Sequence, residues 1–179
     1  MSIKQVQDWV RHRDTSLFQV VACQGNEPTD ADVAAFETGC GLRLPSEFRD
    51  FMMSPLGGLY VEAREEVWPR AKEFDVGPFW SFLYAVKVFG IAADIPDWLD
   101  IRVQHAWLRD EGYAGLVPFL QIQGDANRYC FNSAGAIVYW DHEEPDDQAI
   151  VQESFGDLLI RELRDLEQRT QRRLTGEHL

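Results

Sequence analysis

The 179-residue sequence predicts an α+β domain with a single mixed, mostly antiparallel β-sheet, flanked by N-terminal helices and a long C-terminal helix. Three observations predict this class. Apolar residues at helical spacing dominate the first third of the chain, short apolar runs between turn residues dominate the last third, and a long amphipathic stripe closes the sequence. No repeat or linker interrupts this order, so residues 1–179 are expected to form one domain.

Two helices are expected before residue 40. Residues 3–13 place their apolar side chains on one helical face, which is typical of a short amphipathic helix. Thr29 stands three residues before Asp32, a weak form of the capping box, and opens a helix expected to run to about Thr38. Glycine tolerates the left-handed conformation at a helix end. The expected stop is formed by Gly39 and Gly41.

A third helix follows Pro45, which suits a first helical position because its missing N–H has no helical partner there. The residues expected to face the core share helical spacing and are Phe48, Phe51 and Met52. This helix is expected to stop at Ser54-Pro55. Gly57-Gly58 then predicts a tight turn into a short strand over residues 59–61.

The middle of the chain alternates between irregular and regular segments. Residues 62–82 mix acids with Trp-Pro, Gly-Pro and Phe-Trp pairs and predict an irregular loop with aromatic anchors. A strand is expected within residues 83–91. A helix is expected over residues 97–111, with His105 on its apolar face.

The last third is expected to be β-structure followed by one helix. The expected strands are residues 116–123, 128–132, 136–140 and 150–151, the middle two forming a hairpin. An acidic loop covers residues 141–147. The closing helix begins at Ser154, with Asp157 three residues on, and residues 175–179 are expected to fray. Its apolar stripe consists of Phe155, Leu158, Leu159, Leu163 and Leu166.

The charge balance limits the kinds of partner. Thirty acidic residues against seventeen basic ones give a net charge of −13. Such a surface repels nucleic acid phosphates and anionic membranes, so neither is an expected partner. A neutral or basic protein partner fits this charge, although acidity also serves solubility alone. Three cysteines without a CxxC pair, no signal peptide and no apolar run of spanning length predict a reduced, cytoplasmic protein.

Several ordered motifs resemble a known family. They are Leu44-Pro45-Ser46-Glu47-Phe48-Arg49-Asp50-Phe51 followed by Gly57-Gly58, then Gly124-Asp125 leading into Tyr129-Cys130-Phe131, then Ile137-Val138-Tyr139-Trp140-Asp141-His142-Glu143. In this order they resemble the SUKH superfamily, the fold of Smi/Knr cell-wall regulators and many bacterial immunity proteins. Glu37 before the first motif agrees. The resemblance covers residues 29–166, with helix 3–13 as an addition and 62–115 longer than in compact members.

The resemblance implies an α+β fold without catalysis or cofactor. It implies a non-catalytic protein-binding domain, and for bacterial members an immunity protein that binds and neutralises a polymorphic toxin, often a nuclease or deaminase. Two alternatives stay open: a regulatory interaction module of the Smi/Knr type without a toxin partner, and a metal-dependent hydrolase. The oligomeric state and the identity of any toxin stay open as well.

The acidic loop is the candidate contact with a basic partner. Five carboxylates within seven residues create a negative field that speeds encounter and orients a basic toxin domain. The expected partner-binding residues are Trp140, Asp141, Glu143, Glu144, Asp146 and Asp147. A solvated loop and a metal site are the alternatives, but the spacing matches no EF-hand and His142 has no second zinc ligand nearby. Trp140 fits a buried partner anchor and core packing equally well.

Catalytic signatures are missing from the sequence. It contains no GxSxG, HExxH or phosphate-cradling GxxxxGK[ST] motif. His105 is expected to be half-buried with its polar atoms satisfied, and Cys130 is expected in the core of a strand. No catalytic residue, cofactor site or metal ligand is therefore assigned, and the chain is not expected to be an enzyme.

Overall fold

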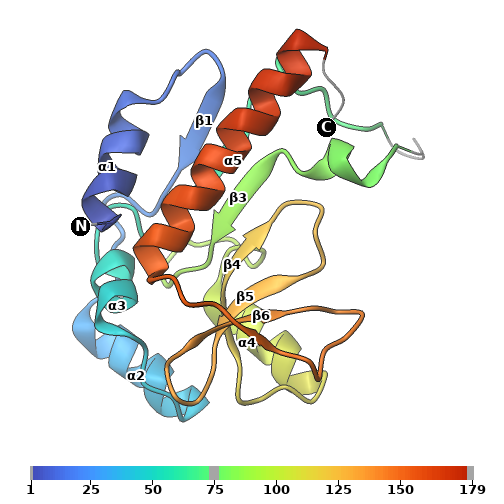
Figure 1. Cartoon of the computed structure of the whole chain (residues 1–179). Coiled ribbons are helices and arrows are strands. Elements are labelled where there is room, and N and C mark those ends of the chain that lie inside the picture. Colours follow the sequence, from blue (N-terminus) through green and yellow to red (C-terminus); the bar gives the residue numbers. More distant parts are fainter. Residues whose placement is uncertain (1, 73–76, 177–179) are drawn as a thin grey trace.

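The computed structural model describes residues 2–72 and 77–176 (Figure 1). In these ranges the helices are α1 (Ser2–His12), α2 (Asp30–Cys40), α3 (Ser46–Met52), α4 (Ile101–Asp110) and α5 (Phe155–Thr175), with a short 3₁₀ helix η1 (Phe79–Phe82). The strands are β1 (Phe18–Val21), β2 (Tyr60–Ala63), β3 (Ala85–Val88), β4 (Val117–Ile122), β5 (Arg128–Phe131), β6 (Ile137–Trp140) and β7 (Ala149–Ile150). The predicted α+β class is confirmed.

The seven strands form one open sheet in sequential order, β1 to β7. Each strand pairs antiparallel with the next one along the chain. The predicted single, mostly antiparallel sheet is confirmed, and all pairings between the named strands are antiparallel, because a chain that returns to its neighbour at every step reverses direction every time. The parallel pairing that the described residues contain is an isolated bridge between Gly90 and Asp100. The first strand, β1, was not predicted.

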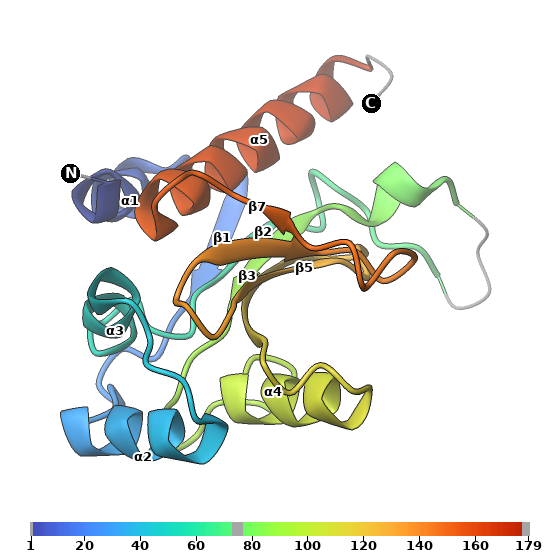
Figure 2. The same cartoon turned by 60° about the horizontal axis from the view of Figure 1, so that its bottom comes forward.

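Helices cover both faces of the sheet (Figure 2). Helix α5 packs across β2 and β3 on one face, with α1 alongside it. Helix α4 packs against β4 on the other face, and α2 lies on that side too. Helix α3 lies at one end and also contacts α5. No described helix is long and apolar enough to cross a membrane.

Local capping explains where the helices begin and end. Thr29 forms the expected capping box with Asp32, but α2 continues through Gly39 and stops at Gly41, the glycine with a left-handed backbone. Helix α4 begins later than predicted because the Asp100 side chain accepts the Arg102 N–H and so caps the helix there. Ser154 caps α5 as expected. Apart from Thr175 and Gly176, the tail expected to fray lies outside the described residues.

One acidic side chain holds α2 to the segment that starts α3. Glu37 is nearly buried, and its Oε1 accepts the backbone N–H of Leu44 at 2.8 Å. Its Oε2 pairs with Arg49, which also pairs with Asp30 at the start of α2. The carboxylate before the Leu-Pro motif therefore serves the fold, because it satisfies a backbone donor and a cation at once.

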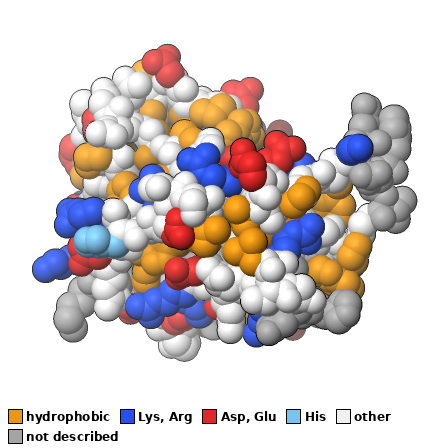
Figure 3. Space-filling model, turned by 90° about the horizontal axis from the view of Figure 1, so that it is seen from above, with side chains coloured by type: hydrophobic (Ala, Val, Ile, Leu, Met, Phe, Trp, Pro, Cys, Tyr) orange, Lys and Arg blue, Asp and Glu red, His pale blue; other side chains and the backbone are white. Residues whose placement is uncertain are grey.

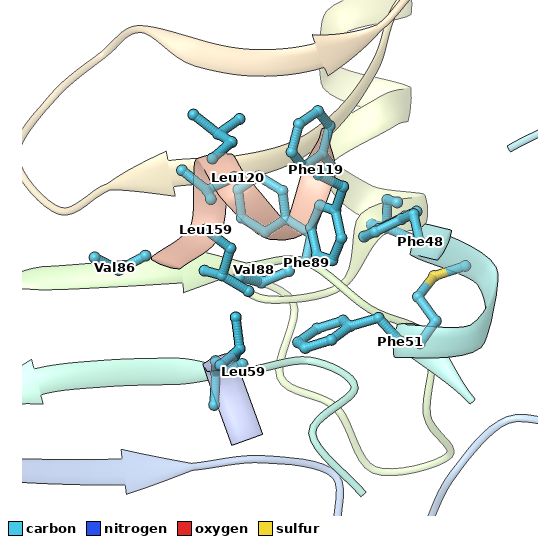
Figure 4. Packing of buried hydrophobic residues seen from close by; sticks show 14 of the residues in the cluster. Phe48, Phe51, Leu59, Val86, Val88, Phe89, Phe119, Leu120 and Leu159 are labelled. Carbon is cyan, nitrogen blue, oxygen red and sulfur yellow. The ribbon is translucent and has the colours of Figure 1, made fainter. Parts of the chain in front are cut away.

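The core is centred on phenylalanines from four elements. Phe48 of α3 lies 5.6 Å from Phe119 of β4, 5.1 Å from Phe131 of β5 and 5.0 Å from Phe155 of α5, measured between ring centroids. Phe51 and Met52 are buried beside it, as predicted. Figure 4 shows Phe48 and Phe51 pointing from α3 towards the sheet residues. Edge-to-face and tilted ring contacts of this kind add to the burial of apolar area.

The two glycines after α3 lie where no side chain fits. A Cβ on Gly57 would lie 2.2 Å from the carbonyl oxygen of Met52, and Gly58 has a φ of +62°. A Cβ on Gly90 would lie 2.5 Å from the backbone nitrogen of Gly58, so the turn and the segment just after β3 are in close backbone contact. The Gly-Gly motif is thus explained by packing.

The core geometry predicts that Phe48→Ala lowers the free energy of unfolding by about 3–5 kcal/mol, because it opens a cavity between four elements. Urea denaturation followed by circular dichroism measures this change. Phe79→Ala is the matched control, since Phe79 is 55 % exposed and its loss is expected to change stability by no more than about 0.5 kcal/mol. Equal losses in both variants would contradict the central place of Phe48.

Candidate partner-binding site

The acidic loop predicted at residues 141–147 joins β6 to β7 and lies on the surface. Two local hydrogen bonds shape it. Asp141 Oδ1 accepts the N–H of Glu143 at 2.9 Å, and the Asp147 N–H donates to the carbonyl of Glu144 at 3.0 Å. Among the five acids Asp141 is half-exposed and the other four are exposed. The loop therefore presents a concentrated negative charge to solvent.

Trp140 does not share this exposure. It is 4 % exposed and packs against Trp107 and Tyr113, with ring centroids 5.9 Å and 5.7 Å away. With Leu108, Leu116, Cys130 and Val138 it forms a second, smaller core cluster between α4 and the sheet. The structure thus favours the core-packing alternative for this residue, and Trp140 supports the acidic loop from beneath.

A surface hollow of about 500 Å³ lies beside the start of the loop. It brings together three segments far apart in sequence: Phe79, the turn 124–127, and residues 141–143. Three carboxylates line it, and they belong to Asp125, Asp141 and Glu143. Because Phe79 is 55 % exposed at its edge, the hollow combines negative charge with an accessible aromatic ring. We call these residues the acidic hollow.

Asn127 holds the two sides of the acidic hollow together. Its Oδ1 accepts the backbone N–H of His142 at 3.0 Å and lies 2.7 Å from Nδ1 of the same ring. Its Nδ2 donates to the hydroxyl of Tyr139 at 2.8 Å, and its own N–H donates to Asp125. Burial raises the pKa of Tyr139, so this hydroxyl stays protonated at neutral pH. One amide thus fixes the loop, the turn and β6.

The acidic hollow contains two of the predicted contact residues, Asp141 and Glu143. Glu144, Asp146 and Asp147 lie further along the loop and do not line it. Burial and the nearby carboxylate of Asp146 instead raise the pKa of the Tyr113 hydroxyl, which lies next to α4. The residues that sequence reasoning missed are Phe79, Asp125 and Asn127. Their only sequence signals were the aromatic pairs of the irregular loop and the Gly-Asp turn, and neither revealed their closeness.

Gly124 determines how closely the turn approaches the irregular loop. It has a φ of +83°, and a Cβ there would lie 2.4 Å from Cβ of Phe82 in η1. No other residue type fits both the backbone conformation and this contact. The Gly-Asp pair therefore places Asp125 beside η1, and this brings Phe79 to the edge of the hollow.

The other groups considered for chemistry are buried in the fold. Cys130 is fully buried, and burial raises the pKa of its thiol, so it stays protonated and inert. His105 is 8 % exposed, and Nε2 lies 3.4 Å from the carbonyl of Ala114. The prediction for Cys130 is confirmed, and His105 lies on the buried face of α4 as predicted but is buried rather than half-buried. Within residues 2–72 and 77–176 no group of three or more His, Cys, Asp or Glu could hold a metal ion.

The net charge is not spread as one continuous anionic surface. On the end of the molecule seen in Figure 3, Lys and Arg side chains lie among Asp and Glu side chains, with hydrophobic side chains exposed between them. Against this mixed surface, the five acids of the loop stand out as a local concentration of one sign.

The sheet, its helices and the acidic hollow define a compact α+β domain whose clearest surface feature suits contact with a protein. The chain belongs to the SMI1 / KNR4 family (SUKH-1), whose model matches residues 27–161. The resemblance to the SUKH superfamily is thereby confirmed. Proteins of this family generally act without catalysis, and the family suggests a role in protein interaction. A comparison with curated proteins found no match.

The hydrogen bonds of Asn127 lead to a prediction about loop order. Asn127→Ala removes the acceptor of the His142 N–H, so amide exchange at His142 is expected to speed up at least about tenfold, with a stability loss of about 1 kcal/mol. Hydrogen exchange followed by NMR measures both. Asn132→Ala is the control, because Asn132 accepts two backbone N–H groups in the β5–β6 turn instead. Unchanged exchange at His142 in Asn127→Ala would show that other contacts hold the loop.

Proposed function

We propose that this protein is an immunity protein, which binds a cognate polymorphic toxin in the cytoplasm of the producing cell and neutralises it without catalysis. The observation that carries the proposal is the acidic hollow on a SUKH-family domain: three carboxylates from two loops beside an exposed phenylalanine. The toxin is of the nuclease or deaminase type, because the surfaces that hold nucleic acid phosphates are basic and match this charge.

The carboxylates and the aromatic ring contribute to such a contact in different ways. Carboxylates of Asp125, Asp141 and Glu143 attract a basic surface over a distance set by salt and orient it on approach. Lysine or arginine side chains of the toxin enter the hollow and pair with them. The Phe79 ring supplies apolar area that is accessible before binding and buried afterwards. Glu144, Asp146 and Asp147 extend the field along the loop.

A regulatory interaction module of the Smi/Knr type is the second candidate, and family membership fits it equally. The two functions differ in the partner. An immunity protein has a toxin gene next to its own and abolishes the activity of that toxin, whereas a regulatory module binds a host protein and leaves toxins active. Both functions would use the acidic hollow, so an experiment that separates them must identify the partner as well as the surface.

The immunity proposal predicts that the purified protein blocks the toxin encoded beside its gene, and that the triple variant Asp125→Asn, Asp141→Asn, Glu143→Gln binds it more slowly. The association rate constant is expected to fall about tenfold at low salt, and the difference is expected to shrink at high salt. Stopped-flow binding and a toxin activity assay measure the two effects.

A variant of equal charge provides the control. Asp50→Asn, Glu65→Gln, Glu66→Gln removes three exposed carboxylates that lie outside the acidic hollow. It is expected to keep most of the wild-type rate. If both triple variants slowed binding equally, net charge and not the hollow would be responsible. If no neighbouring toxin bound or lost activity, the immunity function would be wrong.

A further inference from the structure

A second surface, opposite in charge to the acidic hollow, lies on the sheet face that α4 covers in part. Two cations there stack on two tryptophans. Nζ of Lys87 lies 5.7 Å from the ring centroid of Trp98, and Cζ of Arg128 lies 4.2 Å from that of Trp107. We call these four residues the cation–tryptophan face.

Strand alternation explains why both cations reach the same side. Lys87 lies between Val86 and Val88 in β3, both fully buried, and its side chain points to the opposite face of the sheet. In β5 the hydroxyl of Tyr129 bonds to Glu162 of α5, so the preceding residue, Arg128, points away from α5. Figure 2 shows α4 on the side opposite α5, and α4 supplies Trp107.

Neither cation has a carboxylate partner within the described part of the chain. No ion pair joins Lys87 or Arg128 to an acid, and Nε and Nη1 of Arg128 are buried without a hydrogen-bond acceptor among those residues. Glu62 of the neighbouring strand β2 already forms an ion pair with Arg70 at 2.9 Å. Burial, together with the nearby Arg128, lowers the pKa of Lys87. In a chain with thirty acids, this pair of cations remains unneutralised.

The surroundings of the two cations are exposed and apolar. Trp98 is 45 % exposed, Trp107 is 42 % exposed, and Val103, one turn before Trp107 on α4, is 40 % exposed. Most large apolar side chains of this protein are buried, so two exposed ones one turn apart on α4, with a third just before that helix, are an unusual apolar feature of the surface. Tryptophan and arginine are also the residues that contribute most to protein interfaces.

We propose that the cation–tryptophan face is a second protein-binding surface, and that its occupant is a protein segment carrying carboxylates next to apolar side chains. The carboxylates of that segment pair with Lys87 and Arg128, and its apolar side chains cover Trp98, Val103 and Trp107. Single-stranded nucleic acid also suits tryptophan and cations, but the net charge of −13 opposes it. The face differs from the acidic hollow in charge, so a basic toxin surface is repelled here, although Arg128 directly follows Asn127 of the hollow.

The test uses the full chain and a short synthetic peptide that alternates Asp and Leu, because the exposed tryptophans report binding by their own fluorescence. Wild-type protein is expected to bind this peptide with saturable quenching. Lys87→Met with Arg128→Met is expected to weaken binding at least tenfold, since methionine keeps the volume and removes the charge. Trp107→Ala is expected to weaken it as well. Arg11→Met with Arg43→Met, two exposed arginines elsewhere, is the control and is expected to bind normally.

Other probes separate the proposal from its rivals. A peptide with Asn in place of Asp is expected not to bind, and neither is an oligothymidine strand. Equal binding of the Asn peptide, tighter binding of the oligonucleotide, or unchanged binding by the Lys87 and Arg128 double variant would each overturn the proposal. Thermal unfolding guards against misfolding, because removing two unpaired cations is expected to leave the midpoint unchanged within a few degrees. The acidic-hollow triple variant is expected to bind the peptide as the wild type does.

Discussion

The packing of Phe48 is the constraint on which the rest of the structure depends. Its ring contacts β4, β5 and α5 simultaneously, so one side chain on a seven-residue helix links the N-terminal half of the chain to the sheet and to the last helix. Pro45, Glu37 and the two glycines that follow serve to place that helix. Pro45 begins it, Glu37 binds the chain just before it, and Gly57 lets the chain turn back against Met52. The residues of the motif that marks the family therefore hold α3 in place. Helix and sheet depend on each other here, because Phe48 of α3 and Phe131 of β5 bury each other's rings.

Local signals in the sequence predicted most helices and strands well, but they predicted poorly which elements pair or pack with each other. The N-caps Thr29 and Ser154, the Leu-Pro helix and the stripe of α5 are determined within a few residues, and these were predicted nearly at their true positions. β1 was missed because four residues between a helix and a loop carry almost no periodicity, and Phe18–Val21 becomes a strand only by pairing with β2. The directions of the strands were predicted as mostly antiparallel, and the pairings of the named strands are antiparallel throughout. A helix between β3 and β4 is typical of a parallel crossover, yet here α4 packs back on β4 and the strands remain antiparallel neighbours.

For the candidate site, too, the local features could be predicted from the sequence and their arrangement in space could not. That the loop at 141–147 is acidic and exposed follows from its composition, and the structure adds only its shape. That Trp140 is buried while Phe79 is exposed does not follow, because both are large aromatic residues in segments without clear periodicity. Their exposure depends on α4, which covers Trp140 with Trp107, and on the turn at Gly124, which carries Asp125 against η1. Three carboxylates and one ring therefore converge from positions between Phe79 and Glu143, which span more than sixty residues of the sequence.

The net charge of −13 does not show how positive and negative side chains are distributed over the surface. A protein with an excess of thirteen negative charges could neutralise every cation internally, and several half-buried arginines do have carboxylate partners, as Arg49, Arg70 and Arg161 show. Lys87 and Arg128 are instead held by tryptophan rings, which stabilise a cation without neutralising it. A carboxylate in their place would close the surface to anions, whereas an aromatic ring leaves the positive charge available. The same domain thus offers a negative surface at the acidic hollow and a positive, apolar surface beside α4. Because the two attract opposite charges, a partner that fits one is repelled by the other, and a partner that engages both must carry matching charge in a fixed arrangement. Such an arrangement discriminates between partners more strongly than either surface does alone.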